Sequence, residues 1–352
     1  MLIGAAVGQP SAETVCAPMG SDLRGRLGPM FRGLDSGRGR SVKVRLIAGG
    51  LALAGMAAAA FLIMGRPVVS DQQVQSLNVV LIPADGGTED GTRADYQPIF
   101  DAVGRATGLQ FKLTVAQSYA TVIEALCGGR ADIAFVGPVT YIQARERGCA
   151  ELLAVAEEDG ASTYYAGLFV RAGSDIRSIE DLKGRRAAFG DVNSTSSFLI
   201  PMDMLAKAGL DPARDFSQLR LAGSHTSSLA ALLSDQVDVA ALSFDSFDKA
   251  VAQGAARPED VRIIARSEPI PYPPLVMRSA LSPALKSQLK AAFAGVADAP
   301  GVRPEMIRGY GGKQVDGYRS DVEAAVFDPV AATMARQSDA MKGEILQAAS
   351  RR

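Results

Sequence analysis

Four consecutive hydroxyl side chains, from Ser194 to Ser197, form the first feature of this sequence that could do chemistry. They follow an apolar run that ends at Gly190, and they precede a stretch typical of a helix. The first turn of a helix leaves backbone N–H groups without intrahelical partners and carries a partial positive charge. We therefore expect an oxyanion to bind here without a salt bridge. The alternative is that one serine of the run is an ordinary N-cap residue.

The single histidine of the chain, His225, is the second candidate. As a neutral imidazole it would supply one directional N–H donor without a fixed charge, although a capping or surface role is also open. Ser194 or Ser196 could combine with His225 and Asp245 in the manner of a serine hydrolase. No Gly-x-Ser-x-Gly elbow is present in the sequence, however. We therefore predict that the protein is not an enzyme and has no cofactor.

Two other classes of site are not expected. The formal net charge is −1, so the chain lacks the basic field that holds a nucleic acid. The stretch from Asp85 to Gly91 superficially looks like a calcium loop, but its acids are wrongly spaced and the terminal glutamate is missing. The three cysteines, Cys16, Cys127 and Cys149, have no metal-binding spacing. We predict neither nucleic acid nor a metal ion as a partner.

Short apolar runs alternate with amphipathic stretches from Ser76 onward, and this pattern predicts an α/β fold with mainly parallel sheets. The predicted strands are residues 77–83, 110–115, 132–136, 151–157, 164–171, 186–190, 216–222, 237–243, 261–265 and 275–278. The predicted helices are residues 96–106, 119–126, a segment that begins at Pro138, and residues 194–208, 226–233 and 283–296. Ligands of open α/β sheets bind beyond the carboxyl ends of the strands, so we expect the site at the strand-to-helix turns.

The predicted elements form two α/β sets in series. The second set is bounded by the strand 164–171 and by the proline-dense segment 268–274, which suits neither a helix nor a central strand. This order suggests that one lobe is inserted into the other through two crossover strands, with a hinged cleft between them. The predicted boundaries are a linker of residues 66–76, a first lobe of residues 77–167 and 272–352, and a second lobe of residues 168–271.

The N-terminal part of the chain has a different character. Residues 1–45 are rich in Gly, Ser and Arg, and we predict a disordered basic segment. Residues 46–65 carry no charged side chain and could cross a bilayer core of about 30 Å. The basic residues that precede this segment place the N-terminus in the cytoplasm and the lobes outside the membrane. A cleaved signal segment is the alternative to an uncleaved anchor.

Cys127 and Cys149 are predicted to form a disulfide at the pole opposite the ligand. Cys127 ends one predicted helix, and Cys149 follows the next. Consecutive helices of a right-handed α/β unit end on the same side of the sheet, so the two cysteines should lie close together. Export would supply the oxidising compartment that the bond needs. Two unpaired thiols are the alternative.

Three segments together resemble the phosphate, phosphite and phosphonate substrate-binding proteins of ABC importers. They are the run from Ser118 to Ala144, the segment from Asp191 to Pro201, and the run from Gly223 to Asp245. The resemblance covers roughly residues 77–278. It implies a two-lobed type II periplasmic-binding-protein fold outside the cytoplasm, a small phosphorus oxyanion as ligand, and ABC permease subunits as partners. A binder of another small anion, such as a sulfonate or nitrate, and a ligand-sensing protein of the same fold stay open.

The resemblance also implies a set of ligand-binding residues. Seven positions match the family's ligand contacts: Tyr119, Tyr164 (or its neighbour Tyr165), Ser194, Thr195, Ser196, His225 and Asp245. An acid at the position of Asp245 can pair with an aminoalkyl group, and Asp245 is equally compatible with an N-cap. A further acid that such binders carry after an Ile-Pro pair is absent, because Tyr272 follows Ile270 and Pro271 here. This departure favours phosphate, phosphite or a small alkylphosphonate.

Overall fold

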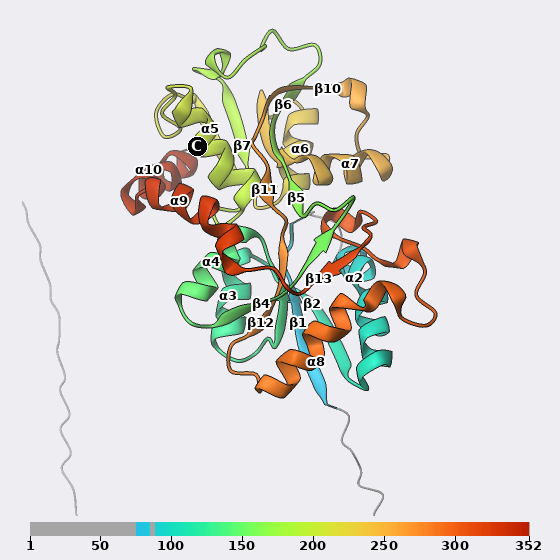
Figure 1. Ribbon diagram of the computed structural model, residues 1–352. Helices are drawn as coiled ribbons and strands as arrows, with labels where there is room; N and C mark the ends of the chain where they lie inside the picture. Colours follow the sequence, from blue (N-terminus) through green and yellow to red (C-terminus); the bar gives the residue numbers. More distant parts are fainter. Residues whose placement is uncertain (1–74, 85–88, 352) are drawn as a thin grey trace, which may run out of the picture. The chain divides into compact units, whose positions relative to one another are not determined.

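The computed structural model describes residues 75–84 and 89–351, which belong to a compact unit of residues 71–352 with two lobes (Figure 1). The predicted basic segment 1–45, the predicted anchor 46–65 and all but the end of the predicted linker 66–76 lie outside the described residues. Within the described part, no helix is both long enough and apolar enough to cross a membrane.

The first lobe is built on a mixed sheet whose strands lie in the order β13-β4-β12-β3-β1-β2. Their bounds are β1 Ser76–Leu81, β2 Gln110–Val115, β3 Ile133–Phe135, β4 Ala150–Glu157, β12 Pro274–Arg278 and β13 Gly317–Arg319. β1 pairs in parallel with β2 and β3, whereas β12 is antiparallel to both β3 and β4. The carboxyl ends of β1, β2 and β3 therefore meet at one edge of the sheet.

Four helices complete the first lobe: α2 (Glu89–Thr107), α3 (Tyr119–Cys127), α4 (Pro138–Glu146) and α8 (Pro283–Ala294). The side chain of Ser118 caps α3 by accepting a hydrogen bond from the Thr121 N–H, and Pro138 occupies the first turn of α4, where its missing N–H costs nothing. α2 packs against β2 and α8, with the Phe100 and Phe293 rings edge to face at 5.5 Å. Ser118 and Pro138 therefore mark the positions at which α3 and α4 begin.

The second lobe has a sheet in the order β10-β6-β9-β7-β8. Its strands are β6 Ala166–Arg171, β7 Arg186–Phe189, β8 Gln218–Leu221, β9 Val239–Ser243 and β10 Val261–Arg266, and its helices are α5 Ile200–Lys207, α6 His225–Leu233 and α7 Phe244–Ala252. One hydrophobic cluster contains Phe189, Phe198 and Leu219, and a separate one contains Phe169 and Leu229. β7, β8 and β9 run in parallel, so their carboxyl ends also share one edge.

The lobes are connected by two crossing strands that pair briefly as β5 (Thr163–Tyr164) and β11 (Ile270–Pro271). After the first lobe is complete, α9 (Asp328–Arg336) and α10 (Asp339–Ser350) lead from the first lobe to the second, drawn in red in Figure 1. Helix α10 packs against β8, and Ile345 is buried in the core of the second lobe. The predicted boundaries grouped residues 272–352 with the first lobe, whereas α10 lies against the second.

Short single-turn helices occupy several connections. They are η1 Glu180–Leu182, η2 Thr195–Leu199, η3 Pro258–Asp260, η4 Val296–Asp298, η5 Pro304–Met306, η6 Tyr310–Gly312 and η7 Ala324–Phe327. Two of them, η2 and η6, lie at the site described below.

The expectation of mainly parallel sheets is wrong. Each sheet combines a parallel half with an antiparallel half, because the strands at or near the crossovers, β6 and β12, re-enter their sheets in the opposite direction. A local alternation of strand and helix predicts the parallel half, but it says nothing of a strand that arrives from the other lobe.

The helix predicted to start at Tyr96 begins earlier, at Glu89. A helix that started at Tyr96 would have Pro98 in its first turn, where proline is tolerated, but in the structure Pro98 lies in the interior of α2. Local sequence rules therefore put the start of this helix about two turns too late.

The predicted disulfide is confirmed. Cys127 at the end of α3 is bonded to Cys149, which follows α4, and their Cα atoms are 4.9 Å apart. Because α3 begins at Tyr119, the bond lies at the opposite end of that helix from the candidate site.

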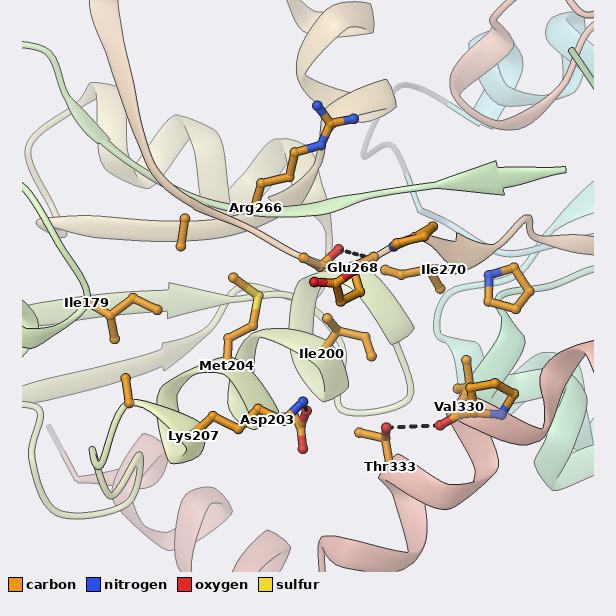
Figure 2. Close-up of a pocket in the computed structure, with 16 residues that line it drawn as sticks. Ile179, Ile200, Asp203, Met204, Lys207, Arg266, Glu268, Ile270, Val330 and Thr333 are labelled. Atoms are coloured by element: carbon orange, nitrogen blue, oxygen red, sulfur yellow. Dashed lines mark hydrogen bonds and ion pairs between the residues drawn. The ribbon is translucent and has the colours of Figure 1, made fainter. Parts of the chain in front are cut away.

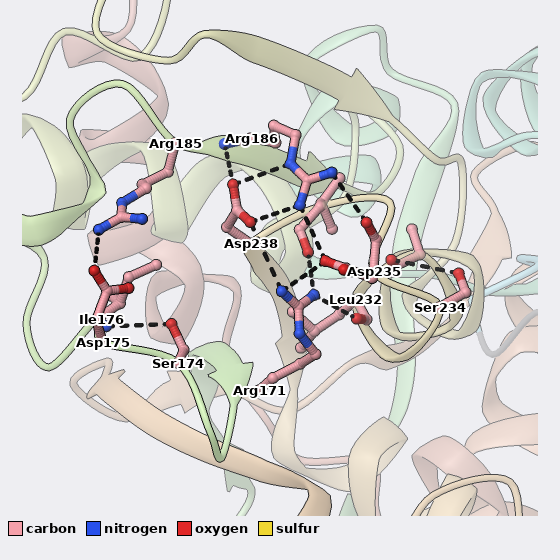
Figure 3. Close-up of polar contacts among 12 residues, drawn as sticks. Arg171, Ser174, Asp175, Ile176, Arg185, Arg186, Leu232, Ser234, Asp235 and Asp238 are labelled. Carbon is pink, nitrogen blue, oxygen red and sulfur yellow. Dashed lines mark hydrogen bonds and ion pairs between the residues drawn. The ribbon is translucent and has the colours of Figure 1, made fainter.

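A cluster of arginine and aspartate side chains lies where β7 and β9 of the second lobe begin (Figure 3). The Asp238 carboxylate accepts hydrogen bonds from the Arg186 backbone N–H at 2.9 Å and from the Arg186 guanidinium at 2.7 and 3.1 Å. Arg171 donates to the carbonyls of Leu232 and Val237 after the last turn of α6. The hydrogen bonds from Arg186 lower the pKa of Asp238 and connect β7 to the start of β9.

We expect Asp238→Asn to lower the free energy of unfolding by about 1 to 2 kcal/mol at neutral pH, since the amide lacks the charge and has only one of the two acceptor oxygens that Arg186 uses. The lowered pKa means that this stability is present above the ordinary pKa of about 3.8 and is lost as the pH falls through the folded value. Urea denaturation at several pH values measures it. Asp175→Asn, at an exposed pair with Arg185, is the matched control and should change little. Equal stability of Asp238→Asn and the native protein at neutral pH would contradict the role of the cluster.

Candidate functional site

The seven residues predicted as ligand contacts are all buried, with exposed fractions from 1 to 9%. All but Tyr164 lie at or near the start of a helix that follows a strand. The side chains of Ser118, Ser194, Ser224 and Ser243 cap these helices by accepting a hydrogen bond from the N–H three residues on. Polar side chains rarely lie so deep unless partners satisfy them, so the site is a buried polar cluster between helix N-termini.

The hydroxyl run begins with a π-helical turn, η2, rather than with the α-helix that the sequence predicts over residues 194–208. The Leu199 N–H donates to the Ser194 carbonyl five residues back, and the α-helix α5 starts only at Ile200. A π turn widens the backbone and is frequent at functional sites. The Ser197 hydroxyl donates to the Ser194 hydroxyl at 2.8 Å, and the Ser197 N–H donates to the same oxygen. Ser194 is therefore an N-cap residue that keeps its own O–H as a donor.

Gly190 at the end of β7 allows this turn to close. A Cβ atom at Gly190 would lie 2.0 Å from the Ser197 Oγ and 2.9 Å from its Cβ. Only glycine leaves room for Ser197 to pack against the strand, and Ser197 is fully buried.

Thr195 connects the two lobes at the centre of the cluster. Its hydroxyl oxygen accepts a hydrogen bond of 2.9 Å from the Val139 N–H, in the first turn of α4. Tyr164, from the crossover strand, has its hydroxyl close to the side chains of Thr195 and Ser196. Burial raises the pKa of Tyr164, so its hydroxyl stays protonated and able to donate. The predicted Tyr164, Thr195 and Ser196 are thus brought together.

Tyr119 opens α3 on the first lobe, as the sequence predicts, and its ring lies near Gly137, beside which the Thr195 hydroxyl also lies. The Tyr119 N–H donates to the Asp191 carboxylate of the second lobe at 3.4 Å. Helix α3 and the η2 turn therefore face one another across the lobes.

His225 is the first residue of α6, and its ring is neutral. Its Nδ1 accepts a hydrogen bond of 3.0 Å from the Ser243 N–H, so the proton of the imidazole is on Nε2. Burial lowers the pKa of His225 to about 3. Its backbone N–H donates to the Ala84 carbonyl of the first lobe, which adds another contact between the lobes. His225 is a directional donor with no charge, as the sequence predicts for a ligand contact.

This arrangement argues against the serine hydrolase alternative. In a Ser-His-Asp triad, Nδ1 carries a proton and donates it toward a carboxylate. In this protein Nδ1 of His225 is an acceptor for a backbone N–H, so it cannot be oriented by Asp245 in that way.

Asp245 lies apart from the hydroxyl run. It is in the first turn of α7 and packs against the backbone of Gly311 in η6, where it lines a pocket of about 360 Å³ with Asp95, Lys249 and Lys313. Burial raises the pKa of Asp245 to about 6, and the nearby Lys313 partly opposes this rise. Asp245 is therefore at the side of the cluster.

Tyr310 belongs to the site, and the sequence analysis missed it. Its ring lies edge to face with Tyr164 at 5.6 Å and with His225 at 6.0 Å, so it joins the crossover to α6. Its hydroxyl is 3.0 Å from the Ser246 hydroxyl. Tyr310 lies beyond the segment that carries the family resemblance, in a stretch without periodic pattern. The Tyr-Gly-Gly sequence of residues 310–312, which forms a tight turn, was the only available signal.

A cavity of about 500 Å³ lies elsewhere, between α5, the segment 265–271 and α9 (Figure 2). Its wall combines apolar residues such as Ile200, Met204 and Val330 with two acids and two bases, Asp203, Glu268, Lys207 and Arg266. None of the seven predicted residues lines it. Both bases already have partners, because Lys207 forms an ion pair with Asp203 at 2.8 Å and the Arg266 guanidinium lies over the Tyr165 ring at 3.7 Å. Asp203 and Glu268 would also repel an anion there, so the buried polar cluster is the better candidate site.

The comparisons with known proteins agree with the resemblance. Residues 87–339 match a family described as the periplasmic substrate-binding protein of phosphonate ABC transporters. The phosphate-import protein PhnD of Mycolicibacterium smegmatis is 28% identical over 232 residues, which is 62% of this chain and 71% of the relative. The phosphonates-binding periplasmic protein of Escherichia coli is 27% identical over 239 residues, which is 66% of this chain and 70% of the relative.

Solved structures show the same fold. A binding protein component of an ABC phosphonate transporter from Pseudomonas aeruginosa superimposes with a TM-score of 0.66 at 23% identity, over 79% of this chain and 98% of that one. A Prochlorococcus marinus protein in complex with methylphosphonate has a TM-score of 0.63 at 17% identity, over 74% of this chain and 98% of that one. These similarities establish the two-lobed periplasmic-binding-protein fold.

The neutral His225 predicts a specific dependence of stability on pH. Because the folded pKa is lowered below the ordinary 6.5, only the unfolded chain takes up this proton as the pH falls, and stability decreases. Between about pH 7.5 and pH 5 the loss from this group should be about 2 kcal/mol. His225→Asn keeps an acceptor for the Ser243 N–H, and its free energy of unfolding should lack this decrease of about 2 kcal/mol as the pH falls. Urea denaturation of both proteins measures it, and parallel pH curves would exclude a buried neutral histidine.

Proposed function

We propose a function for this chain, which belongs to the family of periplasmic substrate-binding proteins of phosphonate ABC transporters. It binds a small phosphorus oxyanion between its lobes and delivers the anion to an ABC importer. The names of the two relatives, a phosphate-import protein and a phosphonates-binding protein, support this ligand class. Proteins of this kind transport their ligand unchanged, so the proposal assigns no catalytic step to the site.

One observation carries the proposal: the hydroxyl run of η2 is buried at a helix N-terminus that faces two further helix N-termini. Ser194, Thr195 and Ser196 have hydroxyls that can donate, and α3 and α6 begin beside them with Tyr119 and His225. Hydroxyl, N–H and imidazole donors suit an anion whose several oxygens each accept hydrogen bonds. None of the seven proposed contacts is a lysine or arginine, so helix dipoles and neutral donors would hold the charge.

The proposed ligand is phosphate, phosphite or a small alkylphosphonate. An aminoalkyl group would need carboxylates around its ammonium, and Asp245 is the only acid among the proposed contacts. The position where a further acid is expected carries Tyr272, whose hydroxyl accepts a hydrogen bond from the Tyr310 N–H. Tyr272 is buried and engaged in the turn that positions Tyr310, so it serves the site through packing.

The proposed location is outside the cytoplasm, with permease subunits of an importer as partners. The Cys127–Cys149 disulfide supports this location, because such bonds persist in oxidising compartments. We further propose that residues 46–65 tether the lobes to the inner membrane, on the basis of their uncharged apolar sequence.

Ser196→Ala should weaken binding of the anion about tenfold to a hundredfold, because a hydrogen bond to a charged group is worth roughly 1.5 to 3 kcal/mol. Calorimetric titration with phosphate, phosphite and methylphosphonate measures the effect. Ser287→Ala, on the exposed face of α8, is the matched control and should bind as the native protein does. If the folded double variant Ser194→Ala/Ser196→Ala kept the native affinity, the η2 turn would not be the anion site.

Asp245→Asn tests whether the Asp245 carboxyl contacts a plain oxyanion or only lies beside it. An ionised carboxylate beside the site repels an anion, and the pKa of Asp245 is about 6. We expect the variant to bind phosphite or methylphosphonate as tightly as the native protein at about pH 8, or up to about tenfold more tightly. The native protein should gain affinity relative to the variant as the pH falls through about 6. A uniform loss of affinity for all three anions would show instead that Asp245 accepts a hydrogen bond from the ligand.

A further inference from the structure

An ion pair joins the two lobes beside the candidate site. The Lys249 Nζ of α7, in the second lobe, is 2.7 Å from the Asp95 Oδ2 of α2, in the first lobe. The two side chains are only 11% and 26% exposed, so the pair is more shielded from water and salt than a surface ion pair. Neither residue is among the proposed ligand contacts.

Asp95 is held in place by the turn that carries Tyr310. A Cβ atom at Gly312 would lie 2.7 Å from the Asp95 carboxyl carbon, and Gly312 has a φ of 70° that favours glycine. The same turn packs against the Asp245 backbone at the start of α7. Asp95, η6 and α7 therefore form one contact surface, and any separation of the lobes would pull Lys249 away from Asp95.

A second set of contacts between the lobes is made by α4 and the turn before η2. The Gln143 amide donates to the Asn193 side-chain oxygen at 3.1 Å, and the Thr140 hydroxyl donates to the Asn193 carbonyl at 3.3 Å. These are neutral hydrogen bonds, and they adjoin the proposed anion contacts directly. The ion pair between α2 and α7 differs from these contacts in two ways: both of its side chains are charged, and neither belongs to the η2 turn.

We propose that Asp95 and Lys249 form a clasp, a pair of positioning residues that stabilises the closed lobes and so sets how long the anion is held. The proposal rests on the proposed function, since it assumes that the closed cleft is the state that holds the ligand. The clasp exists only when the lobes are in contact, so it adds to the stability of the closed state and nothing to the open one. Apparent affinity follows the closed population even though neither residue touches the ligand.

The clasp can be distinguished from the simple effect of charge near an anion. Removing the negative Asp95 should strengthen anion binding through the long-range field, and removing the positive Lys249 should weaken it. Loss of the clasp weakens binding in both cases. Asp95→Asn and Lys249→Gln should therefore each raise the dissociation rate and the dissociation constant, by about 5- to 30-fold.

The test is a double-mutant cycle in the full chain, with phosphate, phosphite and methylphosphonate as probes. Stopped-flow displacement followed by tyrosine fluorescence gives the dissociation rate, and calorimetry gives the affinity. The double variant Asp95→Asn/Lys249→Gln should be no weaker than either single variant, because each single change already removes the pair. The control Lys286→Gln breaks the 2.6 Å ion pair with Glu151 inside the first lobe. It removes one positive charge, as Lys249→Gln does, and should leave the dissociation rate unchanged.

Small-angle scattering of the ligand-free proteins provides the readout that does not need a ligand. We expect both single variants to have a larger radius of gyration than the native protein and the Lys286→Gln control. Opposite effects of the two single variants on affinity, or native dissociation rates together with native radii, would overturn the clasp. If the native protein bound none of the three anions, the proposed function would fail, and the radii alone would decide the clasp.

Discussion

A small anion buried in protein needs a hydrogen-bond donor for nearly every oxygen, because desolvation removes the water that would otherwise supply it. This requirement organises the structure. Donors without a fixed charge are available at helix N-termini, where unpaired N–H groups and capping hydroxyls point in one direction. The serines that cap α3, α6 and α7 and the hydroxyl run of η2 are arranged in this way, on both lobes.

The two-lobed fold follows from the same requirement. In both sheets, the parallel strands end at one edge, and the helices that follow them begin at that edge. Each lobe therefore directs helix N-termini toward the other lobe. Neither lobe alone can surround an anion. Contact between the lobes brings the two sets together, through the Val139 N–H on Thr195 and the His225 N–H on the Ala84 carbonyl. The Tyr164 and Tyr310 rings pack between the crossover and α6, and the polar cluster beside them is buried.

Local patterns predicted much of this arrangement, and the errors have physical causes. The strand Gln110–Val115, the helix start at Tyr119 and the Cys127–Cys149 disulfide were predicted because each depends on nearby sequence or on the handedness of a single α/β unit. The π turn at Thr195 was not, because five-residue hydrogen bonding leaves no mark on apolar periodicity. Tyr310 and α10 were missed for another reason. Their positions depend on packing partners more than 80 residues away along the chain, such as His225 and β8.

The central claim is that the η2 turn and the facing helix N-termini hold a tetrahedral phosphorus anion. A crystal structure of the protein grown with saturating phosphite or methylphosphonate tests it most directly. The account predicts tetrahedral density with oxygens within hydrogen-bond distance of the Ser196 hydroxyl and the His225 Nε2, and with no lysine or arginine in contact. Density for the anion in the cavity behind α5, or on a surface cluster of basic side chains with the η2 turn unchanged, would contradict it.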